Sequence, residues 1–149
     1  MSNKSDENVD SQNTSGEGEV SRRLPNANCD RFLVSLVELV DSTEVGFGIT
    51  LNCGGLTLTG QLISGKKYFY EFAETVAGAF PGDQETKDSI QSSFEQPAKK
   101  YDSNNVAQIE FIHLKDAKII FGVGKMTGNL NLWRGKLSDV TGFSLGKLS

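Results

Sequence analysis

Two stretches of alternating apolar residues, joined by a Gly-Gly pair, constrain the fold more than any other feature of the sequence. In Val45–Cys53 every second residue is apolar, which is the period of a half-buried strand. Gly54 and Gly55 follow, and this dipeptide suits a tight turn whose residues have positive φ angles. Leu56–Ser64 resumes the alternation around Gly60, and glycine within a strand often marks a bulge or a strong bend. The segment therefore predicts an antiparallel β-hairpin.

Helical periodicity lies on both sides of this hairpin. Asp30 is a suitable N-cap, and the apolar residues after it predict a short amphipathic helix that ends near Asp41–Thr43. Ser64 can cap a second helix, which ends at Pro81-Gly82, and a weaker third helix is expected over Asp83–Gln96. The apolar face of the second helix consists of Phe69, Phe72, Val76 and Phe80.

The last third of the chain returns to strand-like segments. β-Branched and aromatic residues are frequent in Val106–Gly122, and Lys115–Ala117 is expected to form a turn or a sharp bend within it. Gly122–Asn129 has the composition of a Gly-rich loop. Leu130–Leu137 and Thr141–Leu148 are the last predicted strands, separated by a short turn. The elements together predict an α+β fold: a small, strongly bent antiparallel sheet with an N-terminal helix and an inserted helical pair.

Residues 1–29 contain almost no apolar side chains and are rich in Ser, Asn, Asp, Glu and Gly. Such a segment cannot bury enough surface to offset its ordering entropy, which predicts a disordered acidic tail before a single domain over residues 30–149. No apolar stretch approaches the roughly 18 residues of a membrane span, and the N-terminus has no apolar signal-peptide core. We therefore expect a soluble, cytoplasmic protein that contacts no membrane.

Charge is divided unevenly along the chain. Arg31–Ala98 contains four basic and nine acidic residues, whereas Lys99–Ser149 contains eight basic and four acidic residues. The basic C-terminal part indicates an interacting surface, although charge runs are more often solvated faces. The net charge of −4 argues against generic nucleic-acid binding, which usually needs a strong basic excess.

Three patterns with possible chemistry do not form complete sites. Gly122–Lys125 contains the Gly and Lys of a phosphate-binding loop, but the spacing is wrong and a strand follows instead of a helix. His113 has no neighbouring nucleophile or orienting acid, so we interpret it as a partly buried strand histidine with a backbone hydrogen bond. Cys29 and Cys53 are expected to be free thiols, because two cysteines and one histidine cannot supply a usual zinc site. The sequence predicts no catalytic residue, metal or cofactor.

Trp133, Arg134 and Lys136 are the candidate binding residues. Tryptophan and arginine are the residue types most enriched at binding hot spots. Neighbouring residues on a strand point to opposite faces, so one of Trp133 and Arg134 enters the core and the other meets solvent or a partner. Because large aromatic residues dominate core burial, Trp133 is the expected core residue.

Two segments near the C-terminus read FIHLKDAKIIFG and LWRGKLSDVTGFSLGKLS, and an upstream segment reads GFGITLNCGGLTLTGQLISGKKYFYEF. Together they resemble the gas vesicle accessory protein U (GvpU) family over roughly Arg31–Ser149. The resemblance implies a cytoplasmic, non-enzymatic accessory factor. It would act in gas vesicle assembly or organisation through contacts with shell or other accessory proteins. It assigns no role to any residue.

The order of elements also resembles that of Sm-like barrels, which are small, strongly bent sheets that commonly assemble into rings. The shared features are a short helix, a Gly-Gly hairpin and a late strand that contains Arg134 and Gly135. The chain departs from that pattern by inserting helices from about Gly65 to Pro97. An Sm-like RNA-binding module is therefore the alternative function, although nucleic acid is not the expected partner. Self-association is a further expectation, because a short sheet has exposed edges that can pair.

Overall fold

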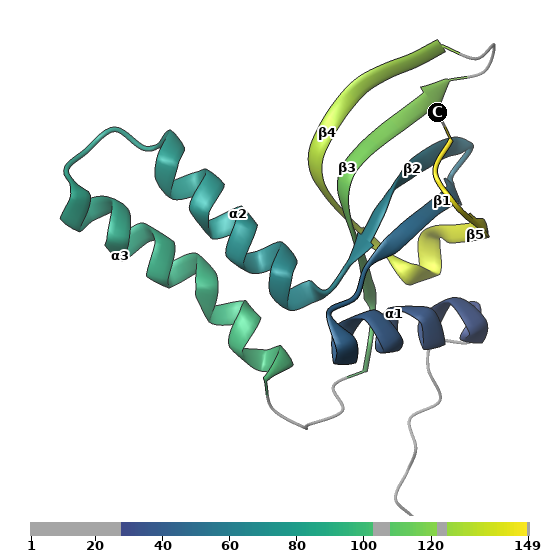
Figure 1. The fold of residues 1–149 in the computed structure, drawn as a ribbon, viewed down its shortest axis with the longest axis horizontal. Coiled ribbons are helices and arrows are strands. Elements are labelled where there is room, and N and C mark those ends of the chain that lie inside the picture. The colour runs from purple at the N-terminus through teal and green to yellow at the C-terminus, as the bar shows by residue number, and fades with distance from the viewer. Residues whose placement is uncertain (1–27, 103–107, 122–124, 149) are drawn as a thin grey trace, which may run out of the picture.

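The computed structural model describes residues 28–102, 108–121 and 125–148 of the chain. Figure 1 shows a bent sheet, a first helix packed on it and a pair of helices that project away from it. The elements, in chain order, are α1 (Arg31–Thr43), β1 (Phe47–Cys53), β2 (Leu56–Ile63), α2 (Gly65–Ala79), α3 (Gln84–Glu95), the 3-10 helix η1 (Gln96–Tyr101), β3 (Phe111–Phe121), β4 (Lys125–Lys136), the 3-10 helix η2 (Leu137–Asp139) and β5 (Val140–Leu145).

The described strands form one five-stranded antiparallel sheet in the order β4-β3-β2-β1-β5. This arrangement confirms the predicted α+β fold with its N-terminal helix and inserted helical pair. The resemblance to Sm-like barrels had suggested a closed sheet, and this was wrong, because the described sheet does not close. Closure requires hydrogen bonds between the two edge strands, and the described parts of β4 and β5 pair only with β3 and β1, respectively.

The Gly-Gly hairpin forms as predicted. Cys53 pairs with Leu56, and Gly54 and Gly55 adopt φ angles of 54° and 83° between them. Two positive φ angles give a turn whose twist matches that of the flanking strands. The local signal was therefore sufficient to define this part of the sheet.

The predicted bend at Gly60 is also present. The register between β2 and β3 shifts opposite this residue, and on β3 Asp116 has a φ of 49°. A Cβ on Gly60 would lie 3.1 Å from both the Cα of Ala117 and the carbonyl oxygen of Lys115. The expected turn or bend at Lys115–Ala117 is thus a bulge within a continuous strand, facing a glycine that lets the two backbones approach closely.

The core lies between α1 and one face of the sheet. α1 begins at the predicted N-cap, where Asp30 Oδ1 accepts a hydrogen bond from the backbone N–H of Phe32 at 2.8 Å. Cys29, just before it, packs against the core, whereas residues 1–27 of the predicted tail lie outside the described residues. The buried core residues are Leu33, Val37, Val40, Ile49, Leu51, Leu58, Leu62, Ile112, Leu114, Ala117, Leu137 and Val140.

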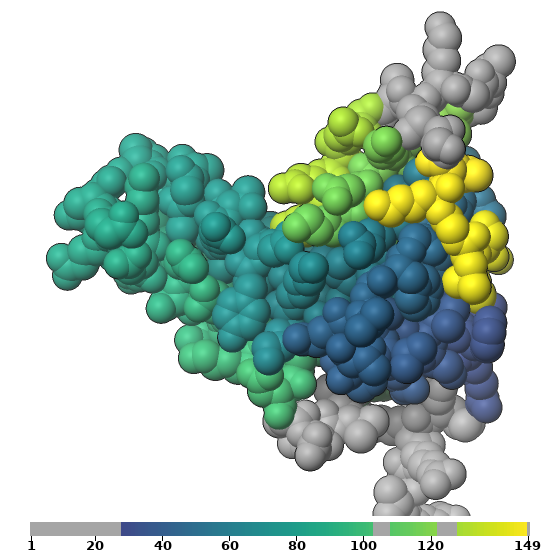
Figure 2. Space-filling view, in the orientation of Figure 1, coloured from purple at the N-terminus to yellow at the C-terminus, as the bar shows by residue number. Residues whose placement is uncertain are grey.

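We call α2 and α3 together, residues 65–95, the helical arm. Figures 1 and 2 show the arm standing clear of the body that the sheet and α1 form. At its base, Ser64 Oγ accepts a hydrogen bond from Lys67 N at 3.0 Å, and Asp41 Oδ1 accepts one from Gly65 N at 2.9 Å. The ring of Tyr101 lies against Gly65, where a Cβ would overlap it. These contacts fix the direction in which the arm leaves the sheet.

A salt bridge also ties the arm to the sheet. Lys115 Nζ on β3 lies 2.8 Å from Glu71 Oε1 on α2, and the hydrogen bond to this carboxylate raises the pKa of Lys115. α3 has no buried residue and packs mainly on α2. The salt bridge lies in the second turn of α2, so the arm is held near its start.

The prediction of a Gly-rich loop over Gly122–Asn129 was wrong for Lys125–Asn129, which belongs to β4 and pairs with the end of β3. Gly128 has a φ of 89°, next to a shift in the β3–β4 register. Glycine marks a bulge here, and the partner strand supplies the β-structure that composition alone did not indicate. Gly122–Gly124 lies outside the described residues.

Candidate binding surface

The predicted binding residues lie on β4, one of the two edge strands. They alternate between the two faces of the sheet, as the strand period requires. Their partners on β3 are Leu114 for Trp133, His113 for Arg134, Ile112 for Gly135 and Phe111 for Lys136.

The Trp133 side of β4 faces the core. Trp133 is half-buried and packs against the core residues, as expected. Its six-membered ring lies across Gly135, because a Cβ on Gly135 would lie only 2.6 Å from Cζ2 of the indole. The Trp-Arg-Gly order is thus explained: the residue two positions after the tryptophan must leave room for the ring.

Gly135→Ala is expected to lower the free energy of unfolding by about 1–2 kcal/mol, because the added methyl group overlaps the indole. Trp133 is the only tryptophan of the chain, so its fluorescence reports both the local change and urea unfolding. Gly78→Ala on α2 is the matched control, since a Cβ there meets open space and alanine favours helix. Unchanged emission and unchanged stability in Gly135→Ala would contradict this packing.

Arg134 lies on the outer face of the sheet, where α2 meets it. The residue is exposed, as expected for the neighbour of Trp133, but its guanidinium is engaged within the chain. The guanidinium carbon lies 3.5 Å from the centre of the Phe111 ring and 5.6 Å from that of Phe69. Its Nε donates a hydrogen bond of 3.2 Å to His113 Nε2. Arg134 therefore joins β3, β4 and α2 by cation–π contacts and one hydrogen bond.

His113 differs from the prediction in two ways. It is fully buried rather than partly buried, and its Nε2 accepts from a side chain, Arg134, instead of from the backbone. Burial, and then the positive charge of Arg134, lower the pKa of His113 to about 3. The ring is therefore neutral near pH 7, and the Nε2 lone pair is already occupied by the hydrogen bond, which leaves the proton on Nδ1.

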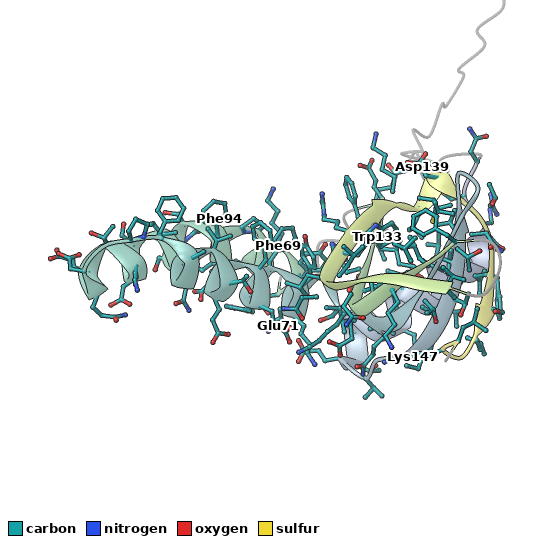
Figure 3. The ribbon with its side chains drawn as sticks, turned by 90° about the horizontal axis from the view of Figure 1, so that it is seen from above. Phe69, Glu71, Phe94, Trp133, Asp139 and Lys147 are labelled. Carbon is teal, nitrogen blue, oxygen red and sulfur yellow. The ribbon has the colours of Figure 1, made fainter. Side chains whose placement is uncertain are left out.

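The burial of His113 follows from α2, which covers this part of the outer face. The Tyr68 ring lies 4.6 Å from the imidazole and the Phe69 ring 5.9 Å, centre to centre. Phe72 continues the contacts along the arm, 5.8 Å from Tyr68 and 5.8 Å from Phe94 on α3. Figure 3 shows Phe69 and Phe94 along one side of the arm and Glu71 along the opposite side.

Sequence reasoning missed the aromatic partners of Arg134. Phe69 and Phe111 appear in the sequence as ordinary apolar residues of a helix and a strand, far apart in the chain. The available signal was a pairing between the strand-like segments Val106–Gly122 and Leu130–Leu137, which places position 113 opposite position 134. The third predicted residue, Lys136, is exposed on the same face.

The described residues contain neither a cluster of three or more metal-ligand side chains nor a membrane-spanning helix. Among them, no three His, Cys, Asp or Glu side chains are grouped so that they could hold a metal ion. Cys29 and Cys53 are free thiols, as expected, and burial raises the pKa of Cys53. None of the described helices has the length and apolar composition needed to cross a bilayer.

A comparison with family models identifies the relatives of this chain. The model described as "Gas vesicle protein GvpU-like" matches residues 30–148. The chain belongs to the GvpU-like family. The resemblance seen in the sequence is thereby confirmed, and the GvpU-like match includes every described helix and strand. No curated protein and no solved structure matches the chain.

The GvpU-like family relates this chain to gas vesicle proteins. Within the described structure the face of β4 that carries Arg134 and Lys136 combines exposed basic groups with a strand edge. β4 contains no acidic residue along its whole length, Lys125–Lys136. The resemblance to Sm-like proteins stays a prediction.

Proposed function

We propose that this GvpU-like protein is a non-enzymatic accessory factor that acts in the assembly or organisation of gas vesicles. It works in the cytoplasm, associated with the vesicles, through contacts with shell proteins or other accessory proteins. The family match supports the vesicle context. The observation that carries the contact hypothesis is the edge strand β4, whose charged residues are all basic and whose Arg134 and Lys136 are exposed on its outer face.

The chemistry of β4 favours an acidic partner segment. An edge strand offers unpaired backbone N–H and C=O groups, to which an extended segment can add as a further strand. Two copies of β4 would place basic residues near basic residues, because the strand has no acid to offset them. A segment with Asp or Glu opposite Arg134 and Lys136 would instead form favourable cross-strand pairs.

Charge reversal at Lys136 tests this contact. Gas vesicles are purified by flotation with the wild-type protein, and the protein that floats with them is measured at increasing concentrations. Lys136→Glu is expected to weaken the association about tenfold, which corresponds to about 1.4 kcal/mol of binding free energy. The lysine is exposed and its neighbour Arg134 keeps the local fold, so the loss reports contact rather than unfolding.

Lys147→Glu is the matched control, because Lys147 is equally an exposed lysine near the C-terminus. A Cβ on Gly48 of β1 would lie 3.0 Å from Lys147 Cγ, which places this lysine beside β1, whereas Lys136 is on the edge strand β4. The control should float as the wild type does. Wild-type protein that stays below the vesicles under all conditions would overturn stable attachment, and equal losses in both variants would overturn the β4 surface.

The Sm-like alternative predicts a different result. Single-stranded RNA would be retarded in gels, and the effect would weaken steeply with salt because phosphate contacts release counterions. The net charge of −4 counts against this alternative, because nucleic-acid binding usually needs a basic excess. RNA retardation lost in Lys136→Glu, together with no flotation, would favour it over the vesicle contact.

A further inference from the structure

The helical arm exposes large aromatic residues near both of its ends. Phe80, directly after α2 at the far end, is 50% exposed, and Phe94, near the return to the sheet, is 42% exposed. Two helices bury only the stripes that face each other, so a lone hairpin leaves apolar surface in water. Figures 1 and 3, which view the molecule from directions 90° apart, both show the far end of the arm projecting away from the sheet and α1.

The charges of the arm are separated along its length. We call residues 80–88 the tip, and residues 64–67 with 96–102 the base. The tip contains three acidic residues against one lysine, and the base contains four lysines against one aspartate. The tip charges are Asp83, Glu85, Asp88 and Lys87, and the base charges are Lys66, Lys67, Lys99, Lys100 and Asp102.

We propose that the arms of two copies of this chain pair antiparallel about a two-fold axis, each acidic tip against the basic base of the other copy. This arrangement brings Phe80 of one copy to the level of Phe94 of the second copy, at both ends of the contact. Parallel pairing would instead place acid against acid and lysine against lysine. A two-fold contact repeats the same residue pairs twice and closes after two copies.

The base contacts prepare the arm for such pairing. Ser64, Asp41 and Tyr101 hold the start of α2, and Lys115 holds Glu71 in the second turn of that helix. A surface held in one direction before binding loses less freedom when it pairs. This inference goes beyond the proposed function, because the contact between copies needs no vesicle partner.

Reversing the charge of the tip in one variant and of the base in another tests the antiparallel pairing. The tip variant carries Glu85→Lys and Asp88→Lys, and the base variant carries Lys67→Glu and Lys99→Glu. All four positions are exposed, so the fold should be retained. Sedimentation velocity on the full chain at low salt is expected to show a dimer that weakens with salt for the wild type. Each variant alone should dimerise at least about tenfold more weakly, which is about 1.4 kcal/mol.

A 1:1 mixture of the two variants distinguishes the arrangement from a general charge effect. In the mixture the basic tip of one chain meets the acidic base of the other, and the remaining pair is the wild-type combination of acidic tip and basic base. Association is therefore expected to return as a heterodimer. Mixed variants that stay apart, or a wild type that is monomeric up to its solubility limit, would overturn the proposal.

The aromatic residues are tested separately. Phe80→Ser with Phe94→Ser should also weaken the dimer about tenfold, because the apolar contact is lost. Leu39→Ser with Val45→Ser is the control, since both residues are exposed large apolar side chains outside the arm. Loss of association in the control alone would place the contact near α1. Monomeric protein that still floats with gas vesicles would overturn this pairing and leave the proposed function standing.

Discussion

Between about pH 7 and pH 4.5, the free energy of unfolding is expected to fall by about 2–3 kcal/mol more in the wild type than in His113→Gln. Burial beside Arg134 lowers the pKa of His113 from 6.5 to about 3. Below pH 6.5 His113 binds a proton in the unfolded chain but stays neutral in the folded chain. The stabilising contribution is therefore complete above pH 6.5 and is lost progressively as the pH falls toward 3.

Urea unfolding of both proteins at a series of pH values measures this difference, with Trp133 emission as the signal. Glutamine is the matched substitution, because its amide oxygen can accept the Arg134 hydrogen bond and it does not titrate. Carboxylates elsewhere contribute equally to both pH profiles and cancel in the comparison. Parallel profiles would show that His113 takes up its proton in the folded protein, contrary to its burial at 1% exposure.

Replacement of Arg134 by methionine is expected to lower the free energy of unfolding by about 3 kcal/mol. Loss of a hydrogen bond from a charged donor to a buried acceptor typically costs about 1.5–3 kcal/mol, and loss of a cation–π contact costs about 0.5–2 kcal/mol. Methionine keeps most of the aliphatic stem, so apolar packing contributes little to the difference. The buried His113 Nε2 would be left without its donor.

Arg134→Lys separates geometry from charge. Lysine keeps the positive charge but has neither the flat guanidinium that stacks on Phe111 nor the Nε donor, so it should recover less than half of the lost stability. Lys136→Met removes a charge from the same face of the same strand and should change stability by no more than about 0.5 kcal/mol. Full stability in Arg134→Lys would show that the charge alone matters.

The parts of the fold that depend on neighbouring residues could be predicted from the sequence. The Gly54-Gly55 turn, the Gly60 bend, the Asp30 cap and the alternation around Trp133 all follow from a few adjacent side chains. Each was confirmed, because turn geometry and strand period are local properties.

The parts that depend on distant segments could not be predicted in the same way. Whether β4 meets β5, and whether Lys125–Asn129 finds a partner strand, depends on how β3 and the bent sheet are placed in space. The burial of His113 depends on α2 crossing the outer face, about forty-five residues earlier in the chain. For the same reason the sequence indicated Arg134 as a candidate contact, but not the rings that hold it.

The ion pair and ring contacts that tie α2 to the sheet lie at residues 68–71, so the length of the helical arm beyond them sets how far its tip reaches. Ser64 and Tyr101 hold the end of the arm next to the sheet, and their contacts do not involve the Pro81-Gly82 turn at the other end. Adding one helical turn to both α2 and α3 would carry that turn about 5.4 Å farther from the sheet without changing any strand register. The reach of the protein can therefore change in helical steps during evolution or in design, while the body that carries the basic edge stays the same.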